Sequence, residues 1–455
     1  MKKHLLRTLA LFLLLAVCLG AFSACSSKGK TLMSLEKDGV SVSFSVNLYQ
    51  LMLSRMKGTL VFNQVTAGGY TANQAKFWDY TDYVEGKGNL TLDQHYRTSI
   101  LDNCRTTLVS LYLFEREHLS LSAATMEKIE SDLQELVRTD GNGSKTKLNA
   151  VLAQYGVNYD MLREAYIMSA KVEAVQKELY GEKAELIGYN LKDNYLNENY
   201  VHFRQIFLEE YHYVYKKDGN GDVIYYHTEG DQKGHVFYDV YNGERKVLDN
   251  GDYATDDHDD EIYYVKGTNY KKIAYDSTNG QPSIELAEDG VSYKTTEMTT
   301  EEKEALKTQA EALYAQVDGV SAADFEAKIA ERNKELGISE VYTDGYYLRT
   351  DTDYLSGGNT YEYLQQIVDA LQTMEDGETM MVKSAMGYHL IMKYAHSEKA
   401  YEKEANEVWF SDFNTRLIEM LYLELCKSYY ADIKVDEAVL ATVPSMKEIG
   451  INYYY

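Results

Sequence analysis

The sequence TMMVKSAMGYHLIMKY, residues 379–394, decides how the second half of this 455-residue chain is interpreted. Two runs of apolar and aromatic residues stand on either side of a short break at 384–387, a pattern that predicts a closing pair of strands. One histidine, His389, stands near the start of the second run. His389 is either a functional group on a strand or a histidine held by hydrogen bonds in the core, and the layout around it has to distinguish the two.

The elements before this strand pair alternate between strand and helix. The stretch YVHFRQIFLEEYHYVYKK (200–217) alternates and is rich in aromatic and β-branched residues, which favours a strand. Capping signals at Thr299 and Ser321 predict two helices. TDGYYLRT (343–350) is typical of a strand, and a helix follows over 361–374. The order strand, helix, helix, strand, helix, strand, strand predicts a compact α+β domain.

Residues 210–298 interrupt this domain with a turn-rich, acidic segment that holds many of the chain's 42 tyrosines. Its two halves, 221–239 and 259–276, each carry a tyrosine pair about a dozen residues before a run that ends in Tyr-Asp. We interpret them as two inserted β-hairpin-like units. The tyrosines suit contact with other chains or with sugars, and they equally suit ordinary cross-strand pairing, so both interpretations stay open.

The two ends of the chain are predicted to be helical. Thr91-Leu92-Asp93-Gln94 has the pattern of a capping box before a helix, and apolar residues at helical spacing follow over 126–137 and 161–179. A last helix is predicted over about 404–430. Each end carries more apolar surface than it could bury alone, so we expect the two ends to pack on each other.

The first residues predict export. Lys2, Lys3 and Arg7 precede an apolar run, Leu9 to Phe22, which has the length of a signal peptide and is short for a permanent membrane anchor, the alternative. The sequence FSAC, ending at Cys25, resembles a bacterial lipobox, although Phe22 replaces the usual leucine. We therefore expect cleavage before Cys25, a lipid on Cys25, and a lipid-anchored protein at the extracytoplasmic face of the cell membrane.

Charge and cysteine content exclude several classes of function. Loss of residues 1–24 removes three positive charges and no negative ones, which moves the net charge from −25 to about −28. With no basic patch, such a chain is not expected to bind nucleic acid. Cys104 and Cys426 lie in apolar helical patterns, which favours buried free thiols over a single bridge. No residue pattern calls for a cofactor.

Two acidic segments have some of the residues expected of a metal-binding sequence. Residues 218–222 open like a calcium loop with Glu229 at the twelfth position, but Val223 occupies the sixth position, where such a loop needs glycine. A hairpin turn explains the same residues. The acidic run 256–261 is more typical of a solvated loop. We therefore predict no metal site.

The combination of features is similar to the PrsA/SurA-type foldases, extracytoplasmic chaperones built around a parvulin-type peptidyl-prolyl isomerase domain. The matching features are the lipoprotein signal, the terminal helices and an α+β domain that ends in Gly-Tyr-His. The local matches are Arg204–Leu208, Ala323–Glu326, Asp376–Glu378 and Gly387–Ile391. The resemblance concerns the layout of most of the chain, because none of these motifs is specific alone.

The resemblance implies an active site with two histidines on central strands, an acidic or thiol partner and an apolar cradle for proline. Its last histidine corresponds to His389, its first to Gln205, and its acidic partner to Asp344. In the cradle, Ile367 replaces a phenylalanine and Tyr363 a methionine, with Tyr388 beside the histidine. The nearby His202 cannot replace Gln205, because three positions along a strand reverse the face. Isomerase activity is therefore uncertain.

The predicted domain layout follows the order of the chain. It comprises a signal peptide (1–24), a lipid-anchored tether (25–34), an N-terminal helical domain (35–199), a parvulin-like domain (200–399) with the insertion (210–298), a C-terminal helix packed on the N-terminal domain (400–434) and a tail (435–455). The predicted function is a foldase that binds unfolded or newly exported polypeptides. An active isomerase and a surface module that binds glycan or protein through the insertion are the two alternatives.

Overall fold

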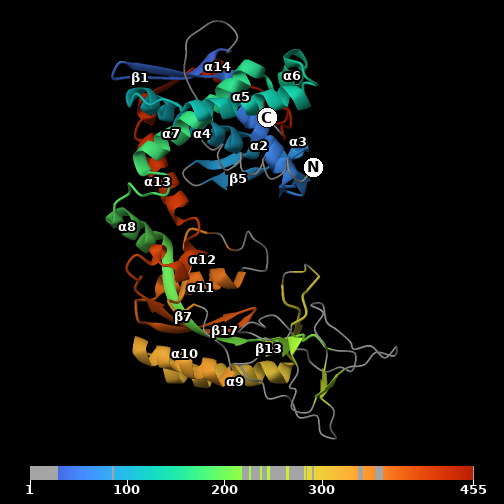
Figure 1. The fold of residues 1–455 in the computed structure, drawn as a ribbon, viewed down its shortest axis with the longest axis vertical. Helices are drawn as coiled ribbons and strands as arrows, with labels where there is room; N and C mark the ends of the chain where they lie inside the picture. The colour runs from blue at the N-terminus through green and yellow to red at the C-terminus, as the bar shows by residue number, and fades with distance from the viewer. Residues whose placement is uncertain are drawn as a thin grey trace, which may run out of the picture. The chain divides into compact units, whose positions relative to one another are not determined.

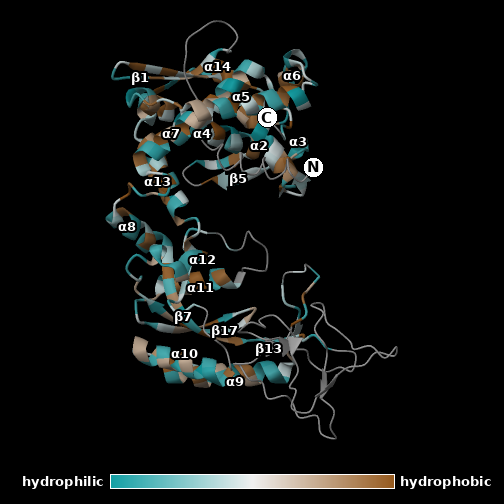
Figure 2. Cartoon of the chain, viewed as in Figure 1, coloured by the Kyte–Doolittle hydropathy of each residue, from teal (hydrophilic) through white to brown (hydrophobic). Residues whose placement is uncertain are grey.

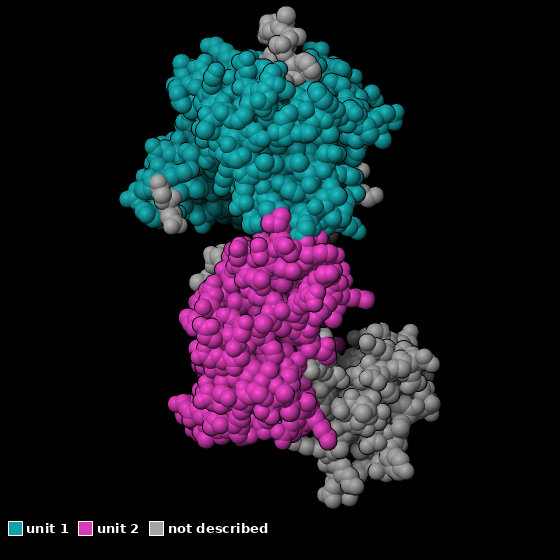
Figure 3. All heavy atoms as spheres, turned by 90° about the vertical axis from the view of Figure 1, so that its left-hand side faces the viewer, with its two compact units in different colours: residues 1–188, 412–455 teal, residues 189–411 magenta. Residues whose placement is uncertain are grey.

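The protein is an α+β chain in two compact units, which Figure 3 colours separately. The computed structural model describes residues 29–84, 87–217, 225–226, 236–237, 243–245, 263–265, 281–282, 284–288, 290, 292–336, 342–352, 354, 362–453 and 455. Unit 1 comprises residues 1–188 and 412–455, and unit 2 comprises residues 189–411. The predicted signal peptide, Cys25 and the two acidic segments weighed as metal sites lie outside the described residues.

Unit 1 contains a sheet that the sequence did not predict. Strands β1 (Thr31–Lys37) and β2 (Val40–Ser45) form a hairpin, and β18 (Ile433–Val435) completes the antiparallel order β18-β1-β2. The expected tether therefore already includes the first residues of a buried strand, in which Leu32 and Met33 are fully enclosed. Unit 1 is thus mixed rather than purely helical.

Helices cover this sheet and follow the predicted pattern closely. The Thr91–Gln94 capping box is present at the start of α4 (Leu92–Arg116), which confirms that prediction. The predicted helices over 126–137 and 161–179 are α5 (Ala123–Thr139) and α7 (Tyr159–Tyr180). The remaining elements of this half are α2 (Val46–Phe62), β3 (Thr66–Ala67), β4 (Tyr70–Thr71), α3 (Ala75–Asp79), β5 (Thr81–Val84), β6 (Gly88–Thr91) and α6 (Lys145–Leu152).

The last long helix is shorter than predicted. It is α13 (Phe413–Lys427), which contacts α4 and α7, while short turns and α12 (Glu407–Phe410) occupy the residues before it. Cys426 on α13 and Cys104 on α4 are both buried and free, as predicted. Among the described residues, no helix is both long and apolar enough to cross a membrane.

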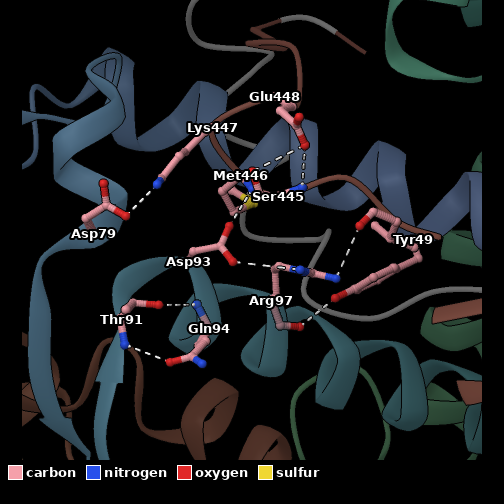
Figure 4. A network of polar contacts seen from close by, with 11 residues as sticks. Tyr49, Asp79, Thr91, Asp93, Gln94, Arg97, Ser445, Met446, Lys447 and Glu448 are labelled. Carbon is pink, nitrogen blue, oxygen red and sulfur yellow. Dashed lines mark hydrogen bonds and ion pairs between the residues drawn. The ribbon is translucent and has the colours of Figure 1, made fainter. Parts of the chain in front are cut away.

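The segment after β18 is not a tail, which corrects the prediction for 435–455. After α14 (Glu437–Leu440) it inserts apolar side chains into the core of unit 1, where Met446 is fully buried. Its backbone is held as well: the carbonyls of Met446 and Ile449 accept from Lys57 Nζ at 2.6 and 2.7 Å, and Asp93 accepts from the Met446 amide. Figure 4 shows the latter contact. The prediction was wrong because the buried apolar residues of this segment, among them Val443, Met446 and Ile449, are widely spaced among polar residues and form no helix or strand pattern.

Unit 2 has the predicted order of strands and helices. A four-stranded antiparallel sheet, β15-β7-β17-β16, is formed by β15 (Tyr346–Arg349), β7 (Tyr200–Glu209), β17 (Gly387–Tyr394) and β16 (Thr379–Ser384). Helices α9 (Thr300–Val317) and α10 (Ala322–Leu336) cover one face, and α11 (Glu362–Thr373) covers the other (Figure 1). Helix α8 (Tyr189–Asn199) also belongs to this unit, ahead of the boundary expected at residue 200.

Side chains of successive strand residues point to opposite faces and so build two separate cores. On the α11 face, Phe203 and Ile391 pack with Ile367. On the other face, Ile206 and Leu390 pack against α9 and α10. Figure 2 shows α9 as mainly hydrophilic, because only a narrow stripe of this helix is needed to cover the sheet. The face of each site residue follows from this alternation.

The insertion begins and ends as a two-stranded ladder. Strand β8 (Tyr211–Tyr213) pairs with β14 (Thr295–Glu297), and inside it β9 (Tyr225–Tyr226) pairs with β10 (Val236–Phe237) and β13 (Gln281–Pro282). The β9–β10 pair is the ladder expected for the first predicted hairpin. In the second, β12 (Tyr263–Val265) pairs with the earlier β11 (Gly243–Arg245), and residues 266–276 lie outside the described residues.

Candidate functional site

His389 lies on a central strand of the unit 2 sheet. It stands on β17 opposite Phe207 of β7, and its side chain points to the α11 face, like that of Ile391 two residues on. Only 1% of the residue's surface is exposed. The histidine is therefore a core residue whose chemistry depends on the groups that contact its two ring nitrogens.

Both ring nitrogens are hydrogen-bonded. Nδ1 lies 2.9 Å from Oε1 of Gln205, and Nε2 lies 2.9 Å from Oγ of Ser384. A glutamine carbonyl oxygen only accepts, so Nδ1 carries the proton and Nε2 accepts from the serine hydroxyl. The Met386 amide in turn donates to Ser384 Oγ at 3.0 Å. This chain of hydrogen bonds links three strands of the sheet and holds the imidazole in one tautomer.

Burial keeps His389 neutral. Loss of hydration, and secondarily the positive charge of Lys383, lowers the pKa of His389 from 6.5 to about 4. A neutral imidazole that is already hydrogen-bonded at both nitrogens is not available as a general base. Its effect is to orient Gln205, whose amide nitrogen has no partner among the described residues and remains able to donate.

Aromatic rings lie parallel to the imidazole. The ring of Phe207 is stacked 4.4 Å from His389 with an angle of 8° between the planes, and that of Tyr363 is 6.0 Å away at 6°. Gln205, Phe207 and Tyr363 are half-buried, whereas Ile367, on the side of α11 that faces the sheet, is fully buried. The structure thus brings four predicted residues, His389, Gln205, Tyr363 and Ile367, to one face, with an apolar surface beside a free amide donor.

Two predicted residues are not part of this arrangement. The Asp344 carboxylate is bound by Lys403 Nζ at 3.0 Å and by Asn406 Nδ2 at 2.8 Å, and it also accepts from Ser397. Burial tends to raise the pKa of Asp344, but the hydrogen bonds from Asn406 and Lys403 and the lysine charge keep the pKa below its usual value. Asp344 therefore stabilises the segment after β17 and does not contact His389.

Tyr388 is the second predicted residue that does not belong to the site. It directly precedes His389 on β17, so it points to the opposite face, where it packs against the α9 and α10 core. His202 also points away from Gln205: its ring is stacked 4.2 Å from that of Tyr347 and contacts the backbone carbonyl of Asp344. The alternation of strand side chains explains both positions.

Two residues that contact His389, Phe207 and Ser384, were not predicted from the sequence. Phe207 follows Gln205 by two positions, so the two-residue period of a strand was sufficient to place it on the same face. Ser384 pairs with Gly387 across the tight hairpin and reaches His389, two residues beyond that glycine. Its detection required the register of the hairpin. Within the described residues, no group of histidine, cysteine or acidic side chains is arranged to hold a metal ion.

Comparisons with known proteins add little at the level of sequence. No family model matches the chain, and no curated protein matches it. Among solved structures, PrsA from Bacillus subtilis is similar at 11% identity and a TM-score of 0.16, covering 81% of this chain and 94% of that chain.

Two further similar solved structures are each described as a foldase protein. PrsA from Streptococcus pneumoniae has 11% identity and a TM-score of 0.18, with 80% of this chain and 98% of that chain covered. PrsA from Lactococcus lactis has 8% identity and a TM-score of 0.19, with 91% and 97% covered. TM-scores this low do not establish a common arrangement of the chains.

Proposed function

We propose that this protein is a foldase that binds unfolded or newly exported polypeptides and accelerates proline isomerisation weakly or not at all. The observation that carries the proposal is the half-buried face formed by Gln205, Phe207 and Tyr363, with the amide of Gln205 fixed by His389. Such a face offers an apolar surface for a proline ring and one hydrogen-bond donor for a backbone carbonyl.

The chemistry of the site explains the weak catalysis that we propose. Rotation about an X-Pro bond crosses a barrier of ~18–20 kcal/mol, and a site lowers it by removing water and weakening the double-bond character of the amide. The aromatic face supplies desolvation. Gln205 is a neutral donor and His389 is neutral as well, so neither stabilises developing charge strongly.

A second binding contribution is proposed for unit 1, whose surface displays separate apolar side chains. Phe62, Tyr83, Leu186 and Leu423 are all between 40 and 69% exposed. Each of these side chains would bury apolar surface if an apolar segment of another chain covered it, which is the contribution that we propose. The sequence features of residues 1–28 support the proposal that the protein acts at the extracytoplasmic face of the membrane, attached through a lipid on Cys25.

The test of catalysis is exchange NMR of a short proline peptide with the chain from Ser26 onward. We expect the natural protein to accelerate isomerisation little, and Gln205→His to accelerate it at least about tenfold more, since a second histidine would supply a chargeable donor. Equal, high activity in both proteins would establish an efficient isomerase and contradict the proposed weak catalysis. Equal inactivity in folded proteins would show that the site lacks more than the histidine.

A further inference from the structure

One line of side chains continues from the His389 face toward the insertion. Along β7 and β8, every second residue shares a face. Gln205, Phe207 and Glu209 follow one another in this way, and Tyr211 and Tyr213 continue the line across the bend at residue 210. A half-buried carboxylate therefore stands two strand positions from the Phe207 ring.

The carboxylate of Glu209 is held by tyrosines rather than by a cation. The hydroxyls of Tyr213 and Tyr211 donate to its Oε1 at 3.0 and 3.3 Å, and their rings are 5.3 Å apart, edge to face. Burial, together with the nearby Glu209 charge, raises the pKa of both hydroxyls, which therefore remain donors at neutral pH. Among the described residues, no lysine or arginine pairs with Glu209, and Oε2 has no partner.

The neighbouring glutamate provides a contrast. Glu210 points to the opposite face, where Lys383 Nζ lies 2.6 Å from its carboxylate and Lys303 Nζ lies 3.7 Å away. The fold thus neutralises Glu210 and leaves Glu209 without a positive partner among the described residues. Opposite Glu209 on β17 stands Gly387, which has no side chain to cover it.

We propose that Glu209 selects client segments in which a lysine or arginine stands two residues from the proline or other apolar residue that contacts Phe207. The proposal rests on the proposed function of the same face and names the class of polypeptide bound there. In an extended chain, residues two apart lie roughly 6.5 Å from each other on one side, which is also the spacing of Phe207 and Glu209 along β7. The free carboxylate oxygen then accepts from the cationic side chain.

The strongly acidic chain favours the same clients at longer range. Its net charge, −25 for the whole sequence and about −28 without residues 1–24, attracts positively charged segments before contact, and salt screens this attraction. The position of the lysine relative to the proline distinguishes selection by Glu209 from this general attraction. A lysine one residue from the proline carries the same charge but points to the other side of an extended peptide, away from Glu209.

The test is a fluorescence-anisotropy titration of labelled pentapeptides with the chain from Ser26 onward. The peptides are Ala-Pro-Ala-X-Ala, where X is lysine, norleucine or glutamate, and the register control Ala-Pro-Lys-Ala-Ala. We expect the lysine peptide to bind about fivefold more tightly than the norleucine peptide and the register control to lose most of this advantage. Glu209→Gln, which keeps an acceptor for both tyrosines, should abolish the advantage. The exposed Glu407→Gln, a matched loss of one charge, should retain it.

Each other outcome has a distinct meaning. If all peptides bind and Glu209→Gln keeps the full lysine preference, the selection by Glu209 is refuted while peptide binding stands. A register control that binds as well as the lysine peptide also refutes it, because general attraction then accounts for the preference. If no peptide binds, the proposed function itself fails.

Discussion

Deletion of residues 443–455 is expected to abolish the cooperative folding of unit 1, the largest effect that we predict. The segment buries Val443, Met446, Ile449 and Tyr455, each no more than 9% exposed. Burial of one large apolar side chain contributes about 1.5–3 kcal/mol. Their combined loss approaches the whole stability of a typical domain, about 5–15 kcal/mol.

The deletion also removes the hydrogen-bond acceptors of a buried cation, Lys57. Lys57 is 5% exposed, and three backbone carbonyls of the segment accept from its Nζ. Burial already lowers the pKa of Lys57. Without these carbonyls the ammonium would have to lose its proton or reach water, which adds to the cost.

The chain's two tryptophans allow each unit to be followed separately. Trp78 is buried in unit 1, and Trp409 packs in unit 2. Urea unfolding of the deletion variant is followed by tryptophan fluorescence. In a Trp409→Phe background only Trp78 emits, and it should show no unit 1 transition. In a Trp78→Phe background only Trp409 emits, and it should still show the unit 2 transition. A normal unit 1 transition in the shortened chain would contradict the assignment of the segment to the core.

A single substitution tests the same packing without deletion. In the interior of α2, Gly58→Ala would normally stabilise the helix by about 0.5–1 kcal/mol. Here a Cβ would lie 1.8 Å from the Asn452 carbonyl oxygen, so we expect destabilisation of about 1–3 kcal/mol instead. Gly188→Ala, where a Cβ meets nothing within 4 Å, is the control; because Gly188 directly precedes α8, we expect only a small N-cap cost of about 0.5 kcal/mol.

Acidification from pH 7 to pH 5 is expected to destabilise unit 2 by about 2 kcal/mol through His389 alone. The pKa of this group falls from 6.5 to about 4 on folding. The unfolded state therefore binds the proton first, and stability that is fully present above pH 6.5 is lost as the pH falls toward 4. Burial also lowers the pKa of His396, whose contribution has the same sign.

His389→Gln separates the contribution of His389 from the rest, since glutamine can hydrogen-bond but does not titrate in this range. In a Trp78→Phe background, urea unfolding followed by Trp409 fluorescence should show a markedly smaller loss of stability between pH 7 and pH 5 with His389→Gln than with His389 present. An equal loss in both proteins would show that His389 is not the buried neutral group described above.

Local patterns predicted much of this fold. The capping boxes at Thr91 and Thr299 and the strand alternation of 200–208 act over a few residues, and the helices and strands of unit 2 appeared in the expected order. The β1–β2 hairpin of unit 1 has a local signal that was missed, Asp38-Gly39 between alternating apolar residues, but the rest of that sheet could not be predicted in the same way. Its third strand, β18, lies about four hundred residues from β1, and only three residues of it pair.

In the candidate site, too, some residue positions follow from local sequence patterns and others depend on contacts with distant parts of the chain. The resemblance paired Gln205 with His389; strand period alone could not, because the two residues lie on different strands whose register the sequence does not give. Within β7, strand period correctly excluded His202. The same rule, applied to Tyr388, would have removed that residue from the predicted set. Asp344 required knowledge of the turn before β15, which directs its carboxylate to Lys403 and Asn406 rather than toward His389. Turn geometry of this kind depends on tertiary partners.

Binding of the neutral peptide Ala-Pro-Ala-norleucine-Ala is finally to be measured with two single-residue variants, each made in the chain from Ser26 onward, and with the unsubstituted chain. Phe207→Ala removes a ring from the proposed binding face, and Tyr388→Ala removes one from the opposite face. We predict that Phe207→Ala weakens binding about tenfold and that Tyr388→Ala leaves it unchanged. Binding that survives Phe207→Ala and is lost in a folded Tyr388→Ala protein would place the polypeptide site elsewhere and contradict the account.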